Sequence, residues 1–356
     1  MVGREVVRLC LAAMLATGLV RPPTVPPDPA PAGFVEAYPS TAAAMEAAGA
    51  PYARWAAQGR QFLAFDSHGD GRAVEVLGDL ATADRIAVLV PGVGTRLADF
   101  DRGLGGVPQR APAEQARALH AALRAADPHA RVAVLAWLGY DPPDGVTTAA
   151  TPAAARRGAD QLGDHLRTLA GRLPAARITV VGHSYGALVV GLAAMDAPPQ
   201  VTDVVTLGGV GVGAEHADQF GPVRVWAAEA PDDWIRRVPQ LRLPGLGHGV
   251  RPADDSFGAR PLPAASTGHD GYLLPGGPTL AAVAEVVLCG ATGTGHARPD
   301  VTVTASDGRR SGTGVAGSDS RSADAISPTA SPGCTWPPSG GDSDPVDTRT
   351  AAGPAR

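Results

Sequence analysis

Residues 182–186 read Gly-His-Ser-Tyr-Gly, a pattern whose residue types suit nucleophilic catalysis by the central serine, Ser184. The surrounding letters, VVGHSYGAL, change from a β-branched run to a run of helix formers. On such a strand-to-helix turn the serine hydroxyl is exposed above the sheet, and the glycines leave room where strand and helix almost collide. The following helix directs its free amides and positive dipole end toward developing negative charge. We therefore predict that Ser184 is a nucleophile; a serine in a helix-capping turn is the alternative.

A serine nucleophile needs a histidine base and an acid that orients it, and for this turn the chain order is serine, acid, histidine. The histidines that follow Ser184 are His216, His248, His269 and His296. His216 comes too early for this order, and His296 begins a low-complexity segment. His269 lies in a loop directly before the last predicted helix, where the base is expected. We predict His269 as the base, with His248 as the alternative.

The acid is expected after the strand predicted at 223–230, where the chain continues PDDWI. This stretch offers Asp232 and Asp233, and Glu229 lies nearer the strand. We favour Asp233, but one residue decides which way a carboxylate faces the histidine, so Asp232 stays open. A helix N-cap is the alternative role, because aspartate is also preferred there.

Two amides are expected to bind the oxyanion of an acyl-transfer reaction. One is the backbone N–H of Tyr185, directly after the nucleophile. The other is expected in the loop VPGVGT, residues 90–95, which follows an earlier predicted strand. We choose the amide of Val93 there, and Gly92 would let the backbone approach the substrate.

Two aromatic residues, Trp137 and Tyr140, come at the end of the strand predicted at 131–140 and just before the turn DPPDG. Side chains at the end of a strand in such a sheet lie near the ligand site. We predict that both line the acyl pocket; core packing beside a turn is the alternative.

The elements that position these residues alternate along the chain. QFLAF and AVEVLG flank the turn DSHGDG, which predicts a hairpin. Apolar strands are then predicted at 85–92, 131–140, 177–183, 201–209 and 223–230, and helices at 112–126, 153–173, 186–195 and 279–288. Apolar strands that alternate with helices form a mostly parallel central sheet with helices on both faces. The predicted fold class is therefore α/β, with ligands bound at the carboxyl ends of the strands.

Composition excludes several classes of function. The chain has 356 residues and a net charge of −5, which gives no electrostatic argument for nucleic acid. It contains no lysine and no asparagine, which excludes a P-loop lysine, a pyridoxal Schiff base and N-linked glycosylation. The spacing of Cys10, Cys289 and Cys334 fits no zinc pattern, and Cys289 and Cys334 would pair in an oxidising compartment. No metal and no organic cofactor is predicted.

Four segments follow from the local composition. Residues 1–20 combine two arginines with an uncharged apolar run, which is typical of a signal peptide or a short anchor. Residues 21–40 are predicted as a proline-rich linker, 41–292 as the α/β domain, and 293–356 as a disordered low-complexity tail. We expect an exported protein, secreted or associated with a membrane through its N-terminal segment. A cytoplasmic protein with an apolar N-terminal helix is the alternative.

Five stretches, taken in order, resemble an actinobacterial α/β-hydrolase family long catalogued as a domain of unknown function: VPGVGTRLADF, WLGYDPP, GHSYGAL, AAEAPDD and GHDGYL. The resemblance covers residues from about 61 to 288. It implies the α/β-hydrolase fold, with Ser184 as nucleophile, His269 as base and an aspartate of APDDWI as acid. Asp233 matches the aspartate of the family's Gly-Asp pattern, and Asp232 stands where the family has glycine. The family does not supply a substrate.

These observations predict a serine hydrolase that cleaves an ester or thioester of a small-molecule acyl substrate through an acyl-enzyme. Ser184, Asp233 and His269 would form the catalytic triad, and the amides of Tyr185 and Val93 would bind the oxyanion. An acyltransferase would use the same site. The rival class is a non-catalytic exported binding protein on a hydrolase scaffold.

Overall fold

Eight strands form one sheet in the order β1-β2-β4-β3-β5-β6-β7-β8. The computed structural model describes residues 34–238, 240 and 248–289. The strands are β1 (Gln61–Asp66), β2 (Arg72–Gly78), β3 (Arg85–Val90), β4 (Val132–Leu138), β5 (Arg177–His183), β6 (Val201–Leu207), β7 (Arg224–Ala228) and β8 (Arg260–Pro261). The α-helices are α2 (Phe34–Ala48), α3 (Tyr52–Ala57), α4 (Pro112–Ala126), α5 (Val146–Ala149), α6 (Ala153–Arg172), α7 (Gly186–Ala194) and α8 (Pro278–Cys289).

The pairing of the strands confirms the mostly parallel sheet predicted from the sequence. From β4 through β3, β5, β6 and β7 to β8, every neighbouring pair is parallel. The antiparallel pairs are β1 with β2, which is the predicted hairpin, and β2 with β4. The sequence did not indicate β8, because a strand of 2 residues is too short for a periodic pattern.

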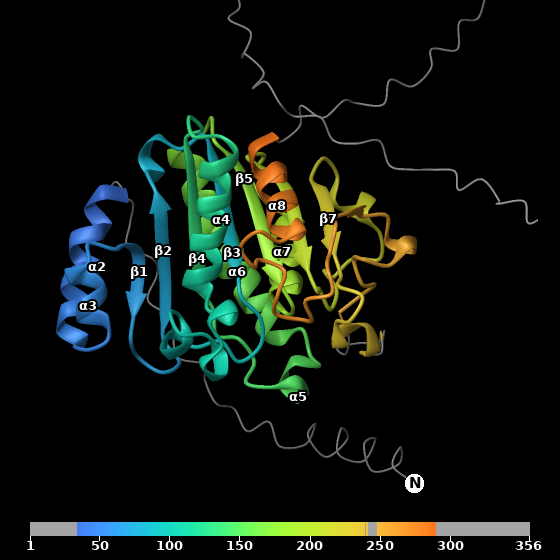
Figure 1. Ribbon diagram of the computed structural model, residues 1–356, viewed down its shortest axis with the longest axis horizontal. Helices are drawn as coiled ribbons and strands as arrows, with labels where there is room; N and C mark the ends of the chain where they lie inside the picture. Colours follow the sequence, from blue (N-terminus) through green and yellow to red (C-terminus); the bar gives the residue numbers. More distant parts are fainter. Residues whose placement is uncertain (1–33, 239, 241–247, 290–356) are drawn as a thin grey trace, which may run out of the picture.

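The order of the strands places a topological switch point between β3 and β5. These strands are neighbours, but β3 is followed by α4 and β5 by α7. Figure 1 shows α4 and α8 on the near face of the sheet and α6 and α7 on the far face. Adjacent strands whose connections leave to opposite faces leave an opening at their carboxyl ends, and ligands bind there in such sheets.

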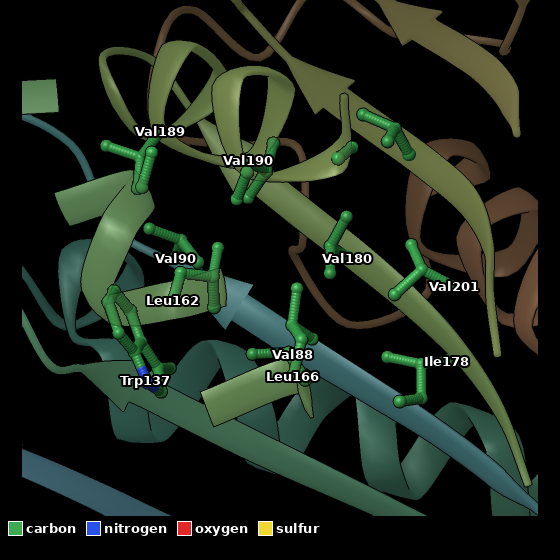
Figure 2. Close-up of a cluster of buried hydrophobic side chains, with 14 of the residues drawn as sticks. Val88, Val90, Trp137, Leu162, Leu166, Ile178, Val180, Val189, Val190 and Val201 are labelled. Atoms are coloured by element: carbon green, nitrogen blue, oxygen red, sulfur yellow. The ribbon is translucent and has the colours of Figure 1, made fainter. Parts of the chain in front are cut away.

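Alternate residues of the central strands belong to two apolar layers. Val88 of β3 packs with Leu162 of α6 and Val189 of α7 in one layer (Figure 2). Leu89 belongs to the other layer, together with Leu119 of α4. Because successive side chains of a strand point to opposite faces, a continuous apolar strand can bury both faces at once. The buried sheet gives the loops at its edge a rigid support.

Helix α2 begins at Phe34, within the range 21–40 that the sequence predicted as a linker. The Thr41 hydroxyl donates a hydrogen bond of 2.7 Å to the Phe62 carbonyl of β1, which ties the helix to the sheet edge. In α3, Trp55 stacks on Phe62 with ring centroids 5.7 Å apart. The part of the predicted linker from Phe34 onward is therefore helical, and these tertiary contacts are not visible in its proline-rich composition.

His165, on α6, is a half-buried titratable residue whose Nε2 atom is shielded from solvent. Its Nε2 atom has no hydrogen-bond partner among the described residues. Burial lowers the pKa of His165 from 6.5 to about 4. Between these values the unfolded chain binds a proton that the folded chain does not, so stability falls as the pH drops through this window. We expect this group to remove about 2 kcal/mol from the free energy of unfolding between pH 7 and pH 5.

Urea unfolding of the wild type and of His165→Leu at the two pH values checks this expectation. The loss of stability on acidification should be smaller by about 2 kcal/mol in the variant, whatever its stability at pH 7. His129→Gln, in an exposed loop, serves as the control and should keep the wild-type pH dependence. An equally steep acid response in His165→Leu would contradict the assignment.

Several predicted features fall outside the described residues, namely the signal peptide or anchor at 1–20 and the tail at 293–356. Cys289, the last residue of α8, is disulfide-bonded. Cys334 is not among the described residues, so its pairing with Cys289 stays a prediction. Within the described ranges, no helix has the length and apolar character needed to cross a membrane.

Candidate active site

Ser184 occupies a strained turn between β5 and α7. Its φ of 55° makes it the one non-glycine residue with a positive φ among the described residues. A Cβ at Gly182 would lie 2.6 Å from the Ala187 Cα, and one at Gly186 would collide with the Val90 carbonyl oxygen. Both glycines are therefore required by the close approach of strand and helix, as the sequence indicated. The turn is further fixed by the Ser184 amide, which donates a 2.9 Å hydrogen bond to the Leu207 carbonyl.

The loop after β3 lies directly against this turn. A Cβ at Gly92 would be 2.8 Å from the Ser184 Cβ and 3.3 Å from the Ser184 Oγ. The absence of a side chain at Gly92 thus brings the backbone of this loop next to the hydroxyl. Among the described residues, the amides of Val93 and Tyr185 donate no backbone hydrogen bond. Two free donors on the segments that flank the Ser184 hydroxyl are suited to an oxyanion.

Asp233 is the acidic residue that the fold brings to the predicted base. Its side chain is fully buried, and its two oxygens each lie 2.9 Å from Nδ1 of His269. The Tyr272 hydroxyl donates a 2.5 Å hydrogen bond to Oδ2, and the Ile235 amide donates one of 2.8 Å to Oδ1. Burial raises the pKa of Asp233, but the hydrogen bonds from His269, Tyr272 and Ile235 outweigh it and lower the pKa overall. The carboxylate is therefore ionised at neutral pH.

The tautomer of His269 follows from these contacts. An ionised carboxylate only accepts hydrogen bonds, so the proton of the neutral imidazole must sit on Nδ1. Nε2 then carries the lone pair with which a general base takes a proton. Among the hydrogen bonds of the described residues, none joins Nε2 of His269 directly to the Ser184 hydroxyl. Catalytic hydrogen bonds are often long in the absence of substrate and shorten in the reactive complex.

Three contacts from separate elements hold the loop that carries His269. Nε2 of His183, at the end of β5, lies 2.7 Å from the carbonyl oxygen of His269. Burial and the neighbouring His269 lower the pKa of His183 to about 4, so its ring is neutral and donates this hydrogen bond. Asp232 accepts a 3.1 Å hydrogen bond from the Gly268 amide. Arg110 forms a 2.7 Å ion pair with Asp270.

The alternatives that the sequence left open occupy other positions. Asp232 is exposed and bonds to the backbone of the His269 loop rather than to the imidazole. Glu229 lies 3.5 Å from the guanidinium groups of Arg236 and Arg251. His248 lies edge-on to the Tyr185 ring at 5.7 Å. Of the weighed acids and bases, Asp233 and His269 are the two that meet.

Trp137 and Tyr140 are buried in the core, and their predicted contact with the acyl chain stays a prediction. They are 2% and 1% exposed and stack on each other at 6.0 Å (Figure 2 shows Trp137 within the core cluster). The Tyr140 hydroxyl donates a 2.7 Å hydrogen bond to the Pro91 carbonyl. Tyr140 therefore supports the loop that carries Gly92 and Val93 from beneath.

Sequence reasoning missed Tyr272, His183 and Trp234. Tyr272 follows His269 in GHDGYL, but only the fold brings its hydroxyl to Asp233. Burial and the hydrogen bond to Asp233 raise the pKa of Tyr272, which keeps it a donor. The Trp234 ring centroid lies 4.6 Å from that of His269. Within the described ranges, no group of three or more histidine, cysteine, aspartate or glutamate residues is arranged to hold a metal ion.

The sheet order, the strand–Ser184–helix turn and the Asp233–His269 contact together define an α/β-hydrolase fold. Comparison with known proteins agrees: the profile of an alpha/beta hydrolase family matches residues 66–243, and the chain belongs to this family. An uncharacterized protein of Mycobacterium tuberculosis is 35% identical over 169 residues, which cover 46% of this chain and 62% of the relative. The chain thus spans less than two thirds of that relative's length.

Two solved structures illustrate how far the likeness extends. Dienelactone hydrolase from Anabaena variabilis is 15% identical, with a TM-score of 0.38 over 64% of this chain and 94% of that chain. Carboxylesterase from Mesorhizobium loti is 15% identical, with a TM-score of 0.37 over 62% of this chain and 96% of that chain. At these scores neither structure carries an argument about the chemistry of this protein.

Proposed function

We propose that this protein is a serine hydrolase that cleaves the ester or thioester bond of a small-molecule acyl substrate. The observation that carries the proposal is the pairing of Asp233 with His269, combined with the left-handed backbone of Ser184. A non-glycine residue held at positive φ costs free energy, and such strain is concentrated at functional sites. An ionised, fully buried carboxylate aimed at one imidazole nitrogen fixes the tautomer that a general base requires.

The proposed acylation step runs through these atoms. Nε2 of His269 takes the hydroxyl proton of Ser184 while Oγ forms a bond to the acyl carbon. The carbonyl oxygen becomes an oxyanion, which the Val93 and Tyr185 amides bind. Asp233 stabilises the imidazolium that has formed. The bond to the leaving group then breaks, and His269 returns the proton to the leaving oxygen or sulfur.

Deacylation repeats the sequence with water. His269 takes a proton from the water, whose oxygen attacks the acyl carbon of the acyl-enzyme. The bond to Ser184 Oγ breaks, and the proton passes from His269 to that oxygen. The products are the carboxylic acid and the regenerated enzyme, and no oxidant or other co-reactant is needed.

An active-site-directed fluorophosphonate tests the proposal, because it phosphonylates only a serine activated by a neighbouring base. The wild type should be labelled at Ser184, located by mass spectrometry of the digested protein. Ser184→Ala should be unlabelled while keeping the wild-type circular dichroism spectrum. A folded wild-type protein that the probe leaves unlabelled would overturn the proposal and favour a binding protein on a hydrolase scaffold.

A further inference from the structure

Trp234 is an exposed aromatic side chain beside the proposed base. It follows Asp233 directly and begins the short 3₁₀ helix η7 (Trp234–Arg237). Its ring centroid is 4.6 Å from that of His269, and the two planes are inclined by 51°. The side chain nevertheless keeps 43% of its surface exposed. One part of the indole therefore contacts the imidazole, and another part faces solvent.

The position of this indole is fixed by the same turn that positions the acid. Asp233 is the N-cap of η7, where its Oδ1 accepts the hydrogen bond from the Ile235 amide. Ile235, the residue after Trp234, is buried in the core. The turn is thus anchored at Asp233 and at Ile235, the residues on either side of Trp234. These contacts hold the backbone that carries the exposed ring.

Exposed apolar side chains gather on the two segments that carry the acid and the base. Four large apolar side chains of the described chain are exposed: Met195, Trp234, Val238 and Leu274. Val238 ends the turn that begins at Asp233, and Leu274 follows His269 in its loop. Of these side chains, Trp234 is the one in contact with His269, and a ligand that covered its indole would remove apolar surface from water.

We infer that Trp234 contacts the leaving group of the substrate, and that the enzyme therefore prefers esters or thioesters whose alcohol or thiol part is apolar. This inference rests on the proposed function. In acylation His269 delivers its proton to the leaving oxygen or sulfur, so that atom must come within hydrogen-bond reach of Nε2. A group attached to that atom is then close to the Trp234 indole, whose ring centroid lies 4.6 Å from that of the imidazole.

Among the described residues, two aromatic rings lie beside His269, and Trp234 is the exposed one. His183 lies 4.8 Å away between ring centroids, but it belongs to β5 and is engaged by the His269 carbonyl. Trp234 is the exposed ring, and an indole face offers a large apolar surface. The acyl part lies toward Ser184 and the proposed oxyanion amides, on other elements. Trp234 is therefore a specificity residue for the leaving group rather than for the acyl chain.

The experiment compares substrates in two pairs. One pair shares the butyryl group and differs in the leaving group: hexyl butyrate against 2-(2-methoxyethoxy)ethyl butyrate, which have similar length but different polarity. The other pair shares the ethyl group and differs in the acyl chain: ethyl butyrate against ethyl hexanoate. Hydrolysis is followed by titration of the released acid. Each substrate is compared between enzyme variants, so differences in intrinsic reactivity cancel.

Trp234→Ala should lower kcat/KM for the hexyl ester about tenfold and for the polar ester less than threefold, since apolar contact is lost only in the first. The ratio between the two ethyl esters should stay at its wild-type value. Trp234→Phe should recover most of the preference for hexyl butyrate. Met195→Ala is the control, because Met195 lies at the end of α7 and, like Trp234, is 43% exposed. This variant should keep the wild-type ratio of kcat/KM for the two butyrate esters and for the two ethyl esters.

A second readout separates substrate contact from support of His269. The acyl-enzyme no longer contains the leaving group, so its deacylation rate should be the same in Trp234→Ala and the wild type. An equal loss on both butyrate esters, together with slower deacylation, would mean that Trp234 only positions the imidazole and would overturn the inference. A changed ratio for the ethyl esters would also overturn it, because it would place the indole on the acyl side.

Failure of this inference is distinguishable from failure of the proposed function. Fluorophosphonate labelling of Ser184 does not involve an apolar leaving group, so Trp234→Ala should be labelled like the wild type. If the wild type is labelled and the leaving-group preference does not depend on Trp234, the inference fails alone. If the folded wild type is not labelled, the proposed function fails first.

Discussion

Asp233→Asn is expected to lower kcat about 10⁴-fold, which corresponds to roughly 5.5 kcal/mol of transition-state stabilisation. An asparagine at this position can turn its amide toward Nδ1 and donate instead of accept. The proton of His269 would then move to Nε2, and the base would lose the lone pair that takes the Ser184 proton. The buried charge that stabilises the imidazolium would also be gone.

Asp232→Asn is the matched control, since it makes the same chemical change one residue earlier. Asp232 is exposed, and its one hydrogen bond to the Gly268 amide uses an oxygen that asparagine keeps. We expect its kcat to fall by less than about tenfold, the range for a loop contact that is retained. The measurement is steady-state hydrolysis by the wild type and both variants at equal protein concentration. Fluorophosphonate labelling first confirms that the wild-type protein is active. Similar losses in the two variants, or a larger one in Asp232→Asn, would remove Asp233 from the proposed role.

Ser184→Gly is expected to abolish hydrolysis while making the folded protein more stable. The φ of 55° strains any residue with a Cβ, and glycine adopts it freely. Relief of this strain should raise the free energy of unfolding by up to about 1 kcal/mol, part of which is lost to the greater entropy of the unfolded glycine chain. Activity should fall at least about 10⁴-fold, because no other group supplies the nucleophile.

Ser184→Ala separates the two effects. It should lose activity to the same extent, but it keeps a Cβ at positive φ and gains no stability from the backbone. Urea unfolding of the wild type and the two variants provides the comparison. If Ser184→Gly were instead less stable than the wild type by more than about 1 kcal/mol, the hydroxyl would be holding the fold together, and a structural role would explain the residue better.

The sequence by itself determined the features that depend on neighbours along the chain. The change from a β-branched run to helix formers, with glycines on both sides of Ser184, predicted the turn between β5 and α7. Apolar runs without alternation predicted strands buried on both faces, and α4 was predicted with its observed bounds, Pro112–Ala126. These signals are local, because backbone sterics and the period of side chains along an element are set within a few residues.

Only the tertiary structure decided which side chains meet. The choice between Asp232 and Asp233 depends on how the turn after β7 is anchored by Ile235, and no spacing rule gives that direction. Tyr272 reaches Asp233 because its ring packs against Gly208, after β6, and its hydroxyl accepts a hydrogen bond from the Ala230 amide, after β7. Trp137 and Tyr140 end a strand in the sequence, yet helix packing buries them. The physical reason is the same in each case: contacts between elements distant in the chain fix the orientation of a side chain, and a linear pattern records only its position.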